Sequence, residues 1–275
     1  MKVGVIGYGT MGRMISEKLS LHRDLIDGKL YLANRSYEKI VDLAEKYHLC
    51  QSNQEIVKEV DILFICVRPS DIKKVLVEIK GGLREEQIIV SLNGSITFEQ
   101  LESICRNKIV KVIPSVMAEI NKSQTLICCN ELVNARDKEH IFQLLEGMGT
   151  VIELPESEMG MGSEMVSCMP GFIAAIFNEI CLSAQKHTNI TPGEVVQMVL
   201  NTMIGTGQLM LENNYSYQDV ITKVATKGGI TEEGVKVIRE SFPQVSDAVF
   251  DKTLEKRRQT TLNAQEAFKK QIPDK

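Results

Sequence analysis

The apolar residues of the first half of the chain come in short continuous runs, with stretches of helical spacing between them. A continuous apolar run bounded by Gly, Pro, Asn or Asp is typical of a strand buried on both faces of a sheet. The clearest run is 61–67, after which Pro69 stops the strand and can open a helix. Strands that alternate with helices predict a mostly parallel, doubly wound α/β sheet. We expect strands at 2–6, 29–33, 49–50, 61–67, 87–92, 108–113, 125–129 and 151–154, and helices at 11–21, 37–47, 53–58, 97–105 and 134–147.

The pattern changes near Pro155, after which strand signals stop and helical spacing continues to the end. Residues 171–186 and 195–211 are apolar on nearly every side, and such helices must be buried all round. A helical domain of about 120 residues cannot easily cover them alone, so we expect a second subunit to pack on them. The alternative is a single central helix buried in a monomer. The predicted domains are 1–155 and an all-helical 156–275.

Composition narrows the class of protein. The chain has 275 residues and a formal net charge of -4, which argues against nucleic acid as the main partner. Seven scattered cysteines without a C-x-x-C pair suit reduced thiols in the cytoplasm, and four histidines without metal-binding spacing predict no metal site. No signal peptide precedes the first strand, and no apolar run approaches a membrane span. We therefore expect a soluble, cytoplasmic protein with no membrane partner.

The first strand runs directly into Gly7-Tyr8-Gly9-Thr10-Met11-Gly12, and a helix follows. A strand, G-x-G-x-x-G and a helix in that order are typical of dinucleotide binding. The first Gly allows the tight turn, the second lets the backbone approach a pyrophosphate, and the third lets helix and strand pack closely. The helix N-terminus offers free N–H groups to the phosphates. The alternative is a Gly-rich turn without a ligand.

The end of the second expected strand indicates which dinucleotide is bound. NAD-binding folds place a carboxylate there, about 20 residues beyond the Gly motif, to hold the ribose hydroxyls. This chain has Asn34-Arg35-Ser36 instead. Arg35 can pair with a 2′-phosphate, and Asn34 and Ser36 can donate hydrogen bonds to it. We therefore favour NADP, with Arg35 as a solvated surface residue as the alternative.

Loops after the later strands are expected to line the nicotinamide half of the cofactor site. Ligands of open α/β sheets lie outside the carboxyl ends of the strands. Val67, Arg68 and Pro69 end one such strand, Asn93 follows the next, and 113–115 end a third. Each of these loops, taken alone, also fits an ordinary connection.

A second polar segment, 225–234, lies between two expected helices. Thr226 and Thr231 supply hydroxyls, and the N–H groups near Gly229 are free at a helix start. Together they can hold a small carboxylate. Simple N-capping of the helix by Thr231 or its neighbours explains the same residues equally well.

These motifs together resemble one known family, pyrroline-5-carboxylate reductase, over essentially the whole chain. Within that family the chain looks closest to the ComER-type proteins of late competence operons. The residues that carry the resemblance are Gly7-Tyr8-Gly9-Thr10-Met11-Gly12, Asn34-Arg35-Ser36, Val67-Arg68-Pro69, Pro114-Ser115, Cys168-Met169-Pro170-Gly171-Phe172 and Thr226-Lys227-Gly228-Gly229-Ile230-Thr231.

The resemblance implies an N-terminal Rossmann domain followed by a helical dimerisation domain with interwoven subunits. It implies NADPH-dependent reduction of a cyclic imine carboxylate, pyrroline-5-carboxylate, to proline, by a homodimer that can form a larger assembly of dimers. It also implies that the last motif seats the substrate carboxylate and that Thr231 and Thr226 act at the reacting centre. The implied substrate-binding residues are Thr226, Gly228, Gly229, Ile230 and Thr231.

Three segments depart from the family pattern. Pro114-Ser115-Val116-Met117 stands where the family has Pro-Asn-Thr-Pro, and Cys168-Met169-Pro170-Gly171-Phe172 stands where it has Ser/Cys-Gly-Pro-Ala-Tyr. The third is Thr226-Lys227-Gly228-Gly229-Ile230-Thr231, which stands where the family has Ser-Pro-Gly-Gly-Thr/Ala-Thr and keeps its hydroxyls through Thr226 and Thr231. At the first segment an apolar pair thus replaces a polar one beside the expected nicotinamide. The altered Pro114 and Pro170 segments support an alternative, ComER-like interpretation: a catalytically altered or non-catalytic NADP-binding protein with a regulatory role linked to competence. The retained Gly228, Gly229 and Thr231 support the reductase.

Overall fold

A single eight-stranded sheet forms the first part of the chain, in the order β3-β2-β1-β4-β5-β6-β7-β8. The computed structural model describes residues 1–22 and 24–269. Neighbouring strands are parallel except for β6 and β7, which are antiparallel. The predicted doubly wound α/β sheet is therefore confirmed. The strands are β1 (Val3–Ile6), β2 (Tyr31–Ala33), β3 (His48–Cys50), β4 (Ile62–Ile65), β5 (Ile88–Ser91), β6 (Lys108–Ile113), β7 (Ser123–Cys129) and β8 (Gly149–Glu153).

The register of the parallel strands defines one edge of the sheet. The last residues of β2, β1, β4 and β5 are paired in a row, so the loops that follow these strands leave from the same edge. The row is Ala33, Ile6, Ile65 and Ser91. This carboxyl edge carries every motif that the sequence assigns to a dinucleotide.

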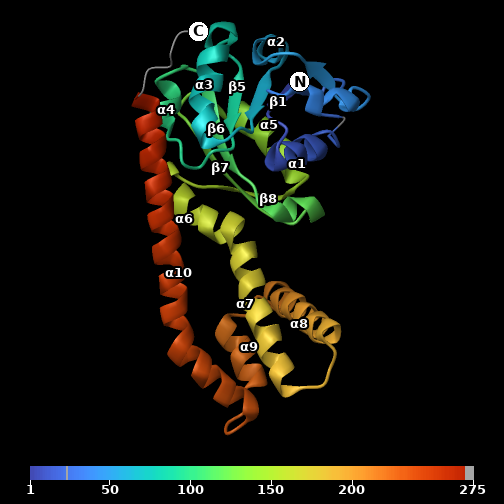
Figure 1. Cartoon of the computed structure of the whole chain (residues 1–275), viewed down its shortest axis with the longest axis vertical. Coiled ribbons are helices and arrows are strands. Elements are labelled where there is room, and N and C mark those ends of the chain that lie inside the picture. Colours follow the sequence, from blue (N-terminus) through green and yellow to red (C-terminus); the bar gives the residue numbers. More distant parts are fainter. Residues whose placement is uncertain (23, 270–275) are drawn as a thin grey trace. The chain divides into compact units, whose positions relative to one another are not determined.

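Helices cover both faces of the sheet, as Figure 1 shows. α1 (Thr10–Leu19) and α5 (Ala135–Glu146) bury apolar side chains in one core cluster. α2 (Asn53–Glu59) and α3 (Pro69–Ile79) pack into the cluster on the other face, with the short α4 (Phe98–Glu102). The last part of the 40-residue helix α10 (Ile230–Lys269) joins that second cluster through Ala264, which is 6% exposed.

The helix expected at 37–47 is wrong. Two 3-10 turns, Tyr37–Lys39 and Val41–Leu43, connect β2 to β3 instead. Ile40 and Tyr47 are both fully inside the core of this face. Ile40 separates the two turns with φ -120° and ψ -5°, outside the helical region. Burial of these two anchors overrides the helical pattern of the intervening polar residues.

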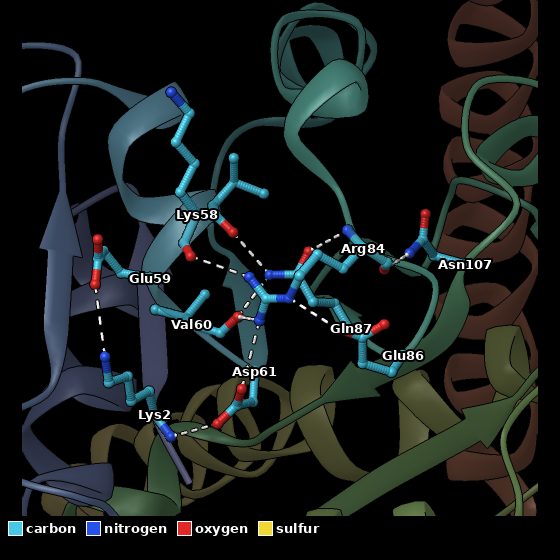
Figure 2. Close-up of polar contacts among 10 residues, drawn as sticks. Lys2, Lys58, Glu59, Val60, Asp61, Arg84, Glu86, Gln87 and Asn107 are labelled. Carbon is cyan, nitrogen blue, oxygen red and sulfur yellow. Dashed lines mark hydrogen bonds and ion pairs between the residues drawn. The ribbon is translucent and has the colours of Figure 1, made fainter.

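A polar network ties the sheet together at the edge where its strands begin (Figure 2). Arg84 donates to the carbonyl oxygens of Lys58 at 3.0 Å and Val60 at 2.9 Å, and so caps the end of α2. Gln87 Nε2 donates to the carbonyl of Val60 at 2.5 Å. The Asn107 amide donates to the carbonyl of Arg84 at 2.7 Å. This network lies opposite the carboxyl edge and serves the fold.

Contacts divide the chain into two compact units, Met1–Cys168 with Leu254–Lys275, and Met169–Thr253. The predicted domain division after residue 155 remains a prediction, and residues 270–275 of that predicted second domain lie outside the described residues. The contact division falls later because α6 (Met159–Ser163) and a π-helical turn (Glu164–Cys168) pack on β7 through Met159 and Val166.

The second unit is helical. It contains α7 (Met169–Ala184), α8 (Pro192–Asn213), α9 (Tyr217–Val224) and the first part of α10. Among the described residues, only Cys181 of α7 and only Val195 of α8 are buried. Large apolar side chains stay exposed in the single chain, among them Ile180, Leu182, Val196, Met198, Leu200, Ile204 and Leu209.

The expectation that no stretch reaches the length of a membrane span is wrong. The continuous helical stretch Glu156–His187, 32 residues, is long and apolar enough to cross a membrane by length and composition. The short helix α6, the π-helical turn and α7 follow one another without a break, although no uninterrupted apolar run spans them. Length and composition alone are weak evidence, because core helices of soluble proteins pass the same test.

Candidate functional site

The loop after β1 has the geometry that a dinucleotide needs. Gly7 has φ +97°, and a Cβ there would lie 2.7 Å from the Cys66 carbonyl oxygen, so only glycine fits. A Cβ on Gly12 would collide with the Gly7 carbonyl, which lets α1 approach β1 closely. Gly9 is different, because a Cβ there would meet no atom within 4 Å. The backbone at Gly9 therefore faces open space, where a ligand can approach it.

The N-terminus of α1 opens onto that same space. Gly9 is the N-cap residue, and no side chain caps the helix. The first N–H groups of an α-helix have no partner within the helix. The backbone amides of Thr10, Met11 and Gly12 are thus available to an anion, together with the positive end of the helix dipole.

Tyr8 and Asn34 hold this loop in place. The Tyr8 N–H donates to Asn34 Oδ1 at 3.0 Å, and Asn34 Nδ2 donates to the Ser36 carbonyl at 2.9 Å. Burial and then Tyr47 raise the pKa of Tyr8 to about 12, so its phenol stays neutral. Asn34 therefore links the end of β2 to the glycine loop, which sequence reasoning did not foresee.

Arg35 is highly exposed, with 84% of its side chain accessible. Its Nη1 lies 3.8 Å from Oδ2 of Asp71, in the first turn of α3. Sequence reasoning missed Asp71 because the two residues follow strands on opposite sides of β1. The signal that identifies it is the strand order β2-β1-β4 combined with a carboxylate at the start of the helix after β4.

The predicted nicotinamide loops are joined by one side chain. Asn93, which is 6% exposed, donates from Nδ2 to the Val67 carbonyl at 3.1 Å. The loop after β5 is thereby fixed to the loop after β4, where Arg68 is exposed and Pro69 opens α3. The structure thus brings four predicted segments to one edge, namely residues 7–12, 34–36, 67–69 and 93.

The apolar departure after β6 forms a 3-10 turn, Val116–Ile120. Val116 is 52% exposed and Ile120 is 71% exposed. Lys18, in the last turn of α1, fastens this turn by donating to the Glu119 carbonyl at 3.0 Å and to Asn121 Oδ1 at 2.6 Å. The altered segment is an ordered surface that offers apolar side chains.

The predicted substrate segment lies in the second unit, between α9 and α10. Gly228 has φ +72°, and the Gly229 N–H donates to the Thr226 carbonyl at 2.9 Å. Thr231 lies inside the first turn of α10, which begins at Ile230, so Thr231 itself is not the N-cap residue, and capping by one of its neighbours stays a prediction. Both threonines are exposed.

Glu232 occupies part of the predicted carboxylate seat. Its Oε2 accepts a hydrogen bond of 2.6 Å from the Gly228 N–H. The seat therefore retains the first amides of α10 and the two threonine hydroxyls. A carboxylate beside it opposes a second one by like-charge repulsion.

Cysteine chemistry finds no support in this geometry. Burial raises the pKa of the Cys66 thiol well above its usual value. Burial, and then the Glu164 carboxylate, raise the pKa of the Cys168 thiol. Protonated thiols are poor nucleophiles. Within residues 1–22 and 24–269, no three His, Cys, Asp or Glu side chains gather as metal ligands would.

Two protein-family models match this chain, one over its N-terminal part and one over its C-terminal part. Residues 2–94 match the model of NADP oxidoreductase, coenzyme F420-dependent. Residues 156–260 match the model of pyrroline-5-carboxylate reductase dimerisation.

Solved structures show the same fold. A 1-pyrroline-5-carboxylate reductase from Streptococcus pyogenes has a TM-score of 0.82 at 20% identity, covering 94% of this chain and 98% of that one. Plasmodium falciparum pyrroline carboxylate reductase, solved with NADP bound, has a TM-score of 0.81 at 20% identity, covering 98% of each chain.

Sequence relatives extend over nearly the full length. ComE operon protein 4 of Bacillus subtilis is 26% identical over 256 residues, which cover 92% of this chain and 94% of the relative. Pyrroline-5-carboxylate reductase 3 of the same organism is 32% identical over 258 residues, which cover 93% of this chain and 95% of the relative. On this similarity, the chain belongs to the pyrroline-5-carboxylate reductase family.

Proposed function

We propose that the protein reduces pyrroline-5-carboxylate to proline with NADPH. The observation that carries this proposal is the uncapped N-terminus of α1 beside the open space at Gly9, in a chain of the reductase family. A pyrophosphate fits this place because free amides and the helix dipole converge there.

Different segments of the chain bind different parts of the cofactor. Gly7, Gly9 and the amides of residues 10–12 hold the pyrophosphate, and Arg35 takes the 2′-phosphate with Ser36 beside it. Asn34 contributes chiefly by holding Tyr8 and Ser36, since both ends of its amide group are already bonded. Residues 67–69 and Asn93 form the nicotinamide half.

The reaction depends more on the orientation of the two reactants than on acid–base groups of the protein. When bound, NADPH would supply a hydride to the carbon of the protonated imine, whose nitrogen would take the C=N bonding pair and keep its proton. The amides of Ile230 and Thr231 and the hydroxyl of Thr226 hold the substrate carboxylate, and Gly228 and Gly229 shape that seat. Thr231 is the polar group we place nearest the reacting nitrogen. Most of the rate then comes from holding the two reactants in register.

The assembly we propose is a homodimer built through α7 and α8. Large apolar side chains on these helices are exposed in the single chain, and the matched dimerisation model covers both helices. A partner that buries these side chains also accounts for the membrane-like composition of 156–187 without a membrane. A larger assembly of dimers, a cytoplasmic location and the absence of nucleic-acid partners remain predictions.

A regulatory role is the second candidate. The apolar turn Val116–Ile120 at the carboxyl edge and the similarity to ComE operon protein 4 favour it. In that case the protein binds NADPH and does not reduce pyrroline-5-carboxylate. Any link to competence then depends on a partner that binds the protein.

The two functions are separated by one pair of measurements. NADPH binding is followed by fluorescence, and NADPH oxidation with pyrroline-5-carboxylate is followed at 340 nm. Turnover that collapses in Thr231→Ala supports the reductase. Tight NADPH binding without turnover supports the regulatory alternative, and failure to bind any dinucleotide contradicts both.

A further inference from the structure

Arg257 is the one charged residue of the C-terminal helix that enters a buried ion pair among the described residues. Its Nε and Nη2 donate to Glu164 Oε1 at 3.0 and 2.7 Å, and Nη2 also donates to Ser163 Oγ at 3.1 Å. Glu164 is 1% exposed and sits at the start of the π-helical turn. Desolvating two charges costs about as much as their attraction returns. Stability alone is therefore a weak reason for this pair.

The arginine reaches the carboxyl edge of the sheet through a path left open by two glycines. A Cβ on Gly160 would lie 3.4 Å from Arg257 Cδ, and a Cβ on Gly94 would lie 3.9 Å from Arg257 Nη1. Gly94 directly follows Asn93, the residue that joins the loops after β4 and β5. Arg257 Nη1 thus lies beside the nicotinamide half of the cofactor site.

Nη1 is the nitrogen of this guanidinium that has no partner. In the described part of the chain, Nε and Nη2 donate to Glu164, Nη2 also donates to Ser163, and no hydrogen bond is formed by Nη1. Glu164 has a free atom too, because its Oε2 is buried without a partner. A charged donor fixed in orientation, with 22% of its side chain exposed, is available to a ligand at this edge.

We propose that Arg257 donates through Nη1 to a ligand oxygen in the nicotinamide half of the site, with Glu164 as the positioning residue that orients the guanidinium. This inference rests on the proposed function. The ligand oxygen belongs either to the carboxamide of the cofactor or to the carboxylate of the substrate, which present the same acceptor to an arginine.

Arg257→Met tests the donor, with Arg258→Met as its matched control. Arg258 is the next residue, is 63% exposed and pairs only locally with Glu255. Two affinities are measured: NADPH by its fluorescence, and proline, as the carboxylate ligand, by calorimetry on the NADP⁺-loaded protein. We expect one of them to weaken about tenfold in Arg257→Met and neither to change in Arg258→Met. A weaker affinity for NADPH assigns the ligand oxygen to the carboxamide of the cofactor. A weaker affinity for proline assigns it to the carboxylate of the substrate.

A second variant separates ligand binding from folding, because Arg257→Met leaves Glu164 buried and unpaired. The double variant Arg257→Met/Glu164→Met removes both charges, so its thermal unfolding should return towards that of the unaltered protein while the ligand defect stays. Glu164→Gln should show a smaller defect in the same affinity, since the guanidinium is held less firmly. Recovery of both affinities in the double variant would overturn the proposal, as would unchanged affinities in Arg257→Met. If the unaltered protein binds no NADPH, the proposed function fails; if it binds and the variants match it, only this inference fails.

Discussion

Asp71 sets how strongly Arg35 can bind a 2′-phosphate. In the free protein Arg35 pairs with Asp71 at 3.8 Å, and both side chains are accessible, 84% and 37%. Such a pair contributes little stability, but its carboxylate repels an incoming phosphate. Asp71→Asn should therefore tighten NADPH binding about fivefold at low salt and less at high salt.

The control for this prediction is the opposite change at the partner. Arg35→Asp removes the phosphate ligand and should exchange the preference for NADPH for one for NADH, since a carboxylate at this position holds ribose hydroxyls. NADH affinity should be unchanged in Asp71→Asn. Equal affinity of the unaltered protein for both cofactors would contradict the assignment of Arg35.

Glu232 weakens substrate binding by the same kind of like-charge repulsion. Its carboxylate accepts from the Gly228 N–H at 2.6 Å, at the turn where the substrate carboxylate is proposed to bind. Glu232→Gln keeps an acceptor for that N–H and removes the charge. We expect the KM for pyrroline-5-carboxylate to fall about threefold with kcat nearly unchanged. A raised KM would instead mean that Glu232 holds the turn in its binding conformation.

At the scale of elements, Arg84 fastens the edge of the sheet that lies away from the site. It caps the end of α2 through the carbonyls of Lys58 and Val60 (Figure 2). Arg84→Met leaves these carbonyls without their charged donor, at a cost of about 2 kcal/mol. The melting temperature should fall by about 5 °C, while NADPH affinity stays unchanged. A loss of NADPH affinity that exceeds the fraction unfolded would show that this edge communicates with the site.

Sequence patterns predicted the elements whose buried apolar residues are continuous along the chain. All eight strands were expected close to their observed bounds, because parallel strands covered on both faces are apolar throughout. Residues 37–47 failed because two buried anchors, Ile40 and Tyr47, outweigh local helical spacing. The antiparallel pairing of β6 with β7 depends on tertiary context that an apolar run does not encode.

The site was predictable to the same extent. Gly7, Gly9 and Gly12 carry their roles in the motif itself, since each glycine is required by a local backbone contact or an open approach. The partners that tune the site, Asp71 for Arg35 and Glu164 for Arg257, lie far from them in sequence. Such pairs follow from strand order and helix packing, and no local pattern indicates them.

At the scale of the whole molecule, exposed apolar side chains predict a dimer through the second unit. Ile204 of α8 is 54% exposed in the single chain, and burying such a side chain is worth about 2 kcal/mol. A charged side chain at position 204 should therefore prevent the two chains from associating. Ile204→Glu is therefore expected to run as a monomer in light scattering, whereas the unaltered protein runs at twice the 30.8 kDa of the chain or more.

Leu21 supplies the matched control, because it is apolar, 71% exposed and located two residues beyond the end of α1 in the other unit. Leu21→Glu should keep the mass of the unaltered protein. If the reaction depends on a seat completed by the neighbouring subunit, Ile204→Glu loses turnover while it still binds NADPH through the first unit. A monomeric mass for the unaltered protein, or an associated Ile204→Glu, would contradict the dimer and leave the exposed apolar faces of α7 and α8 to a different partner.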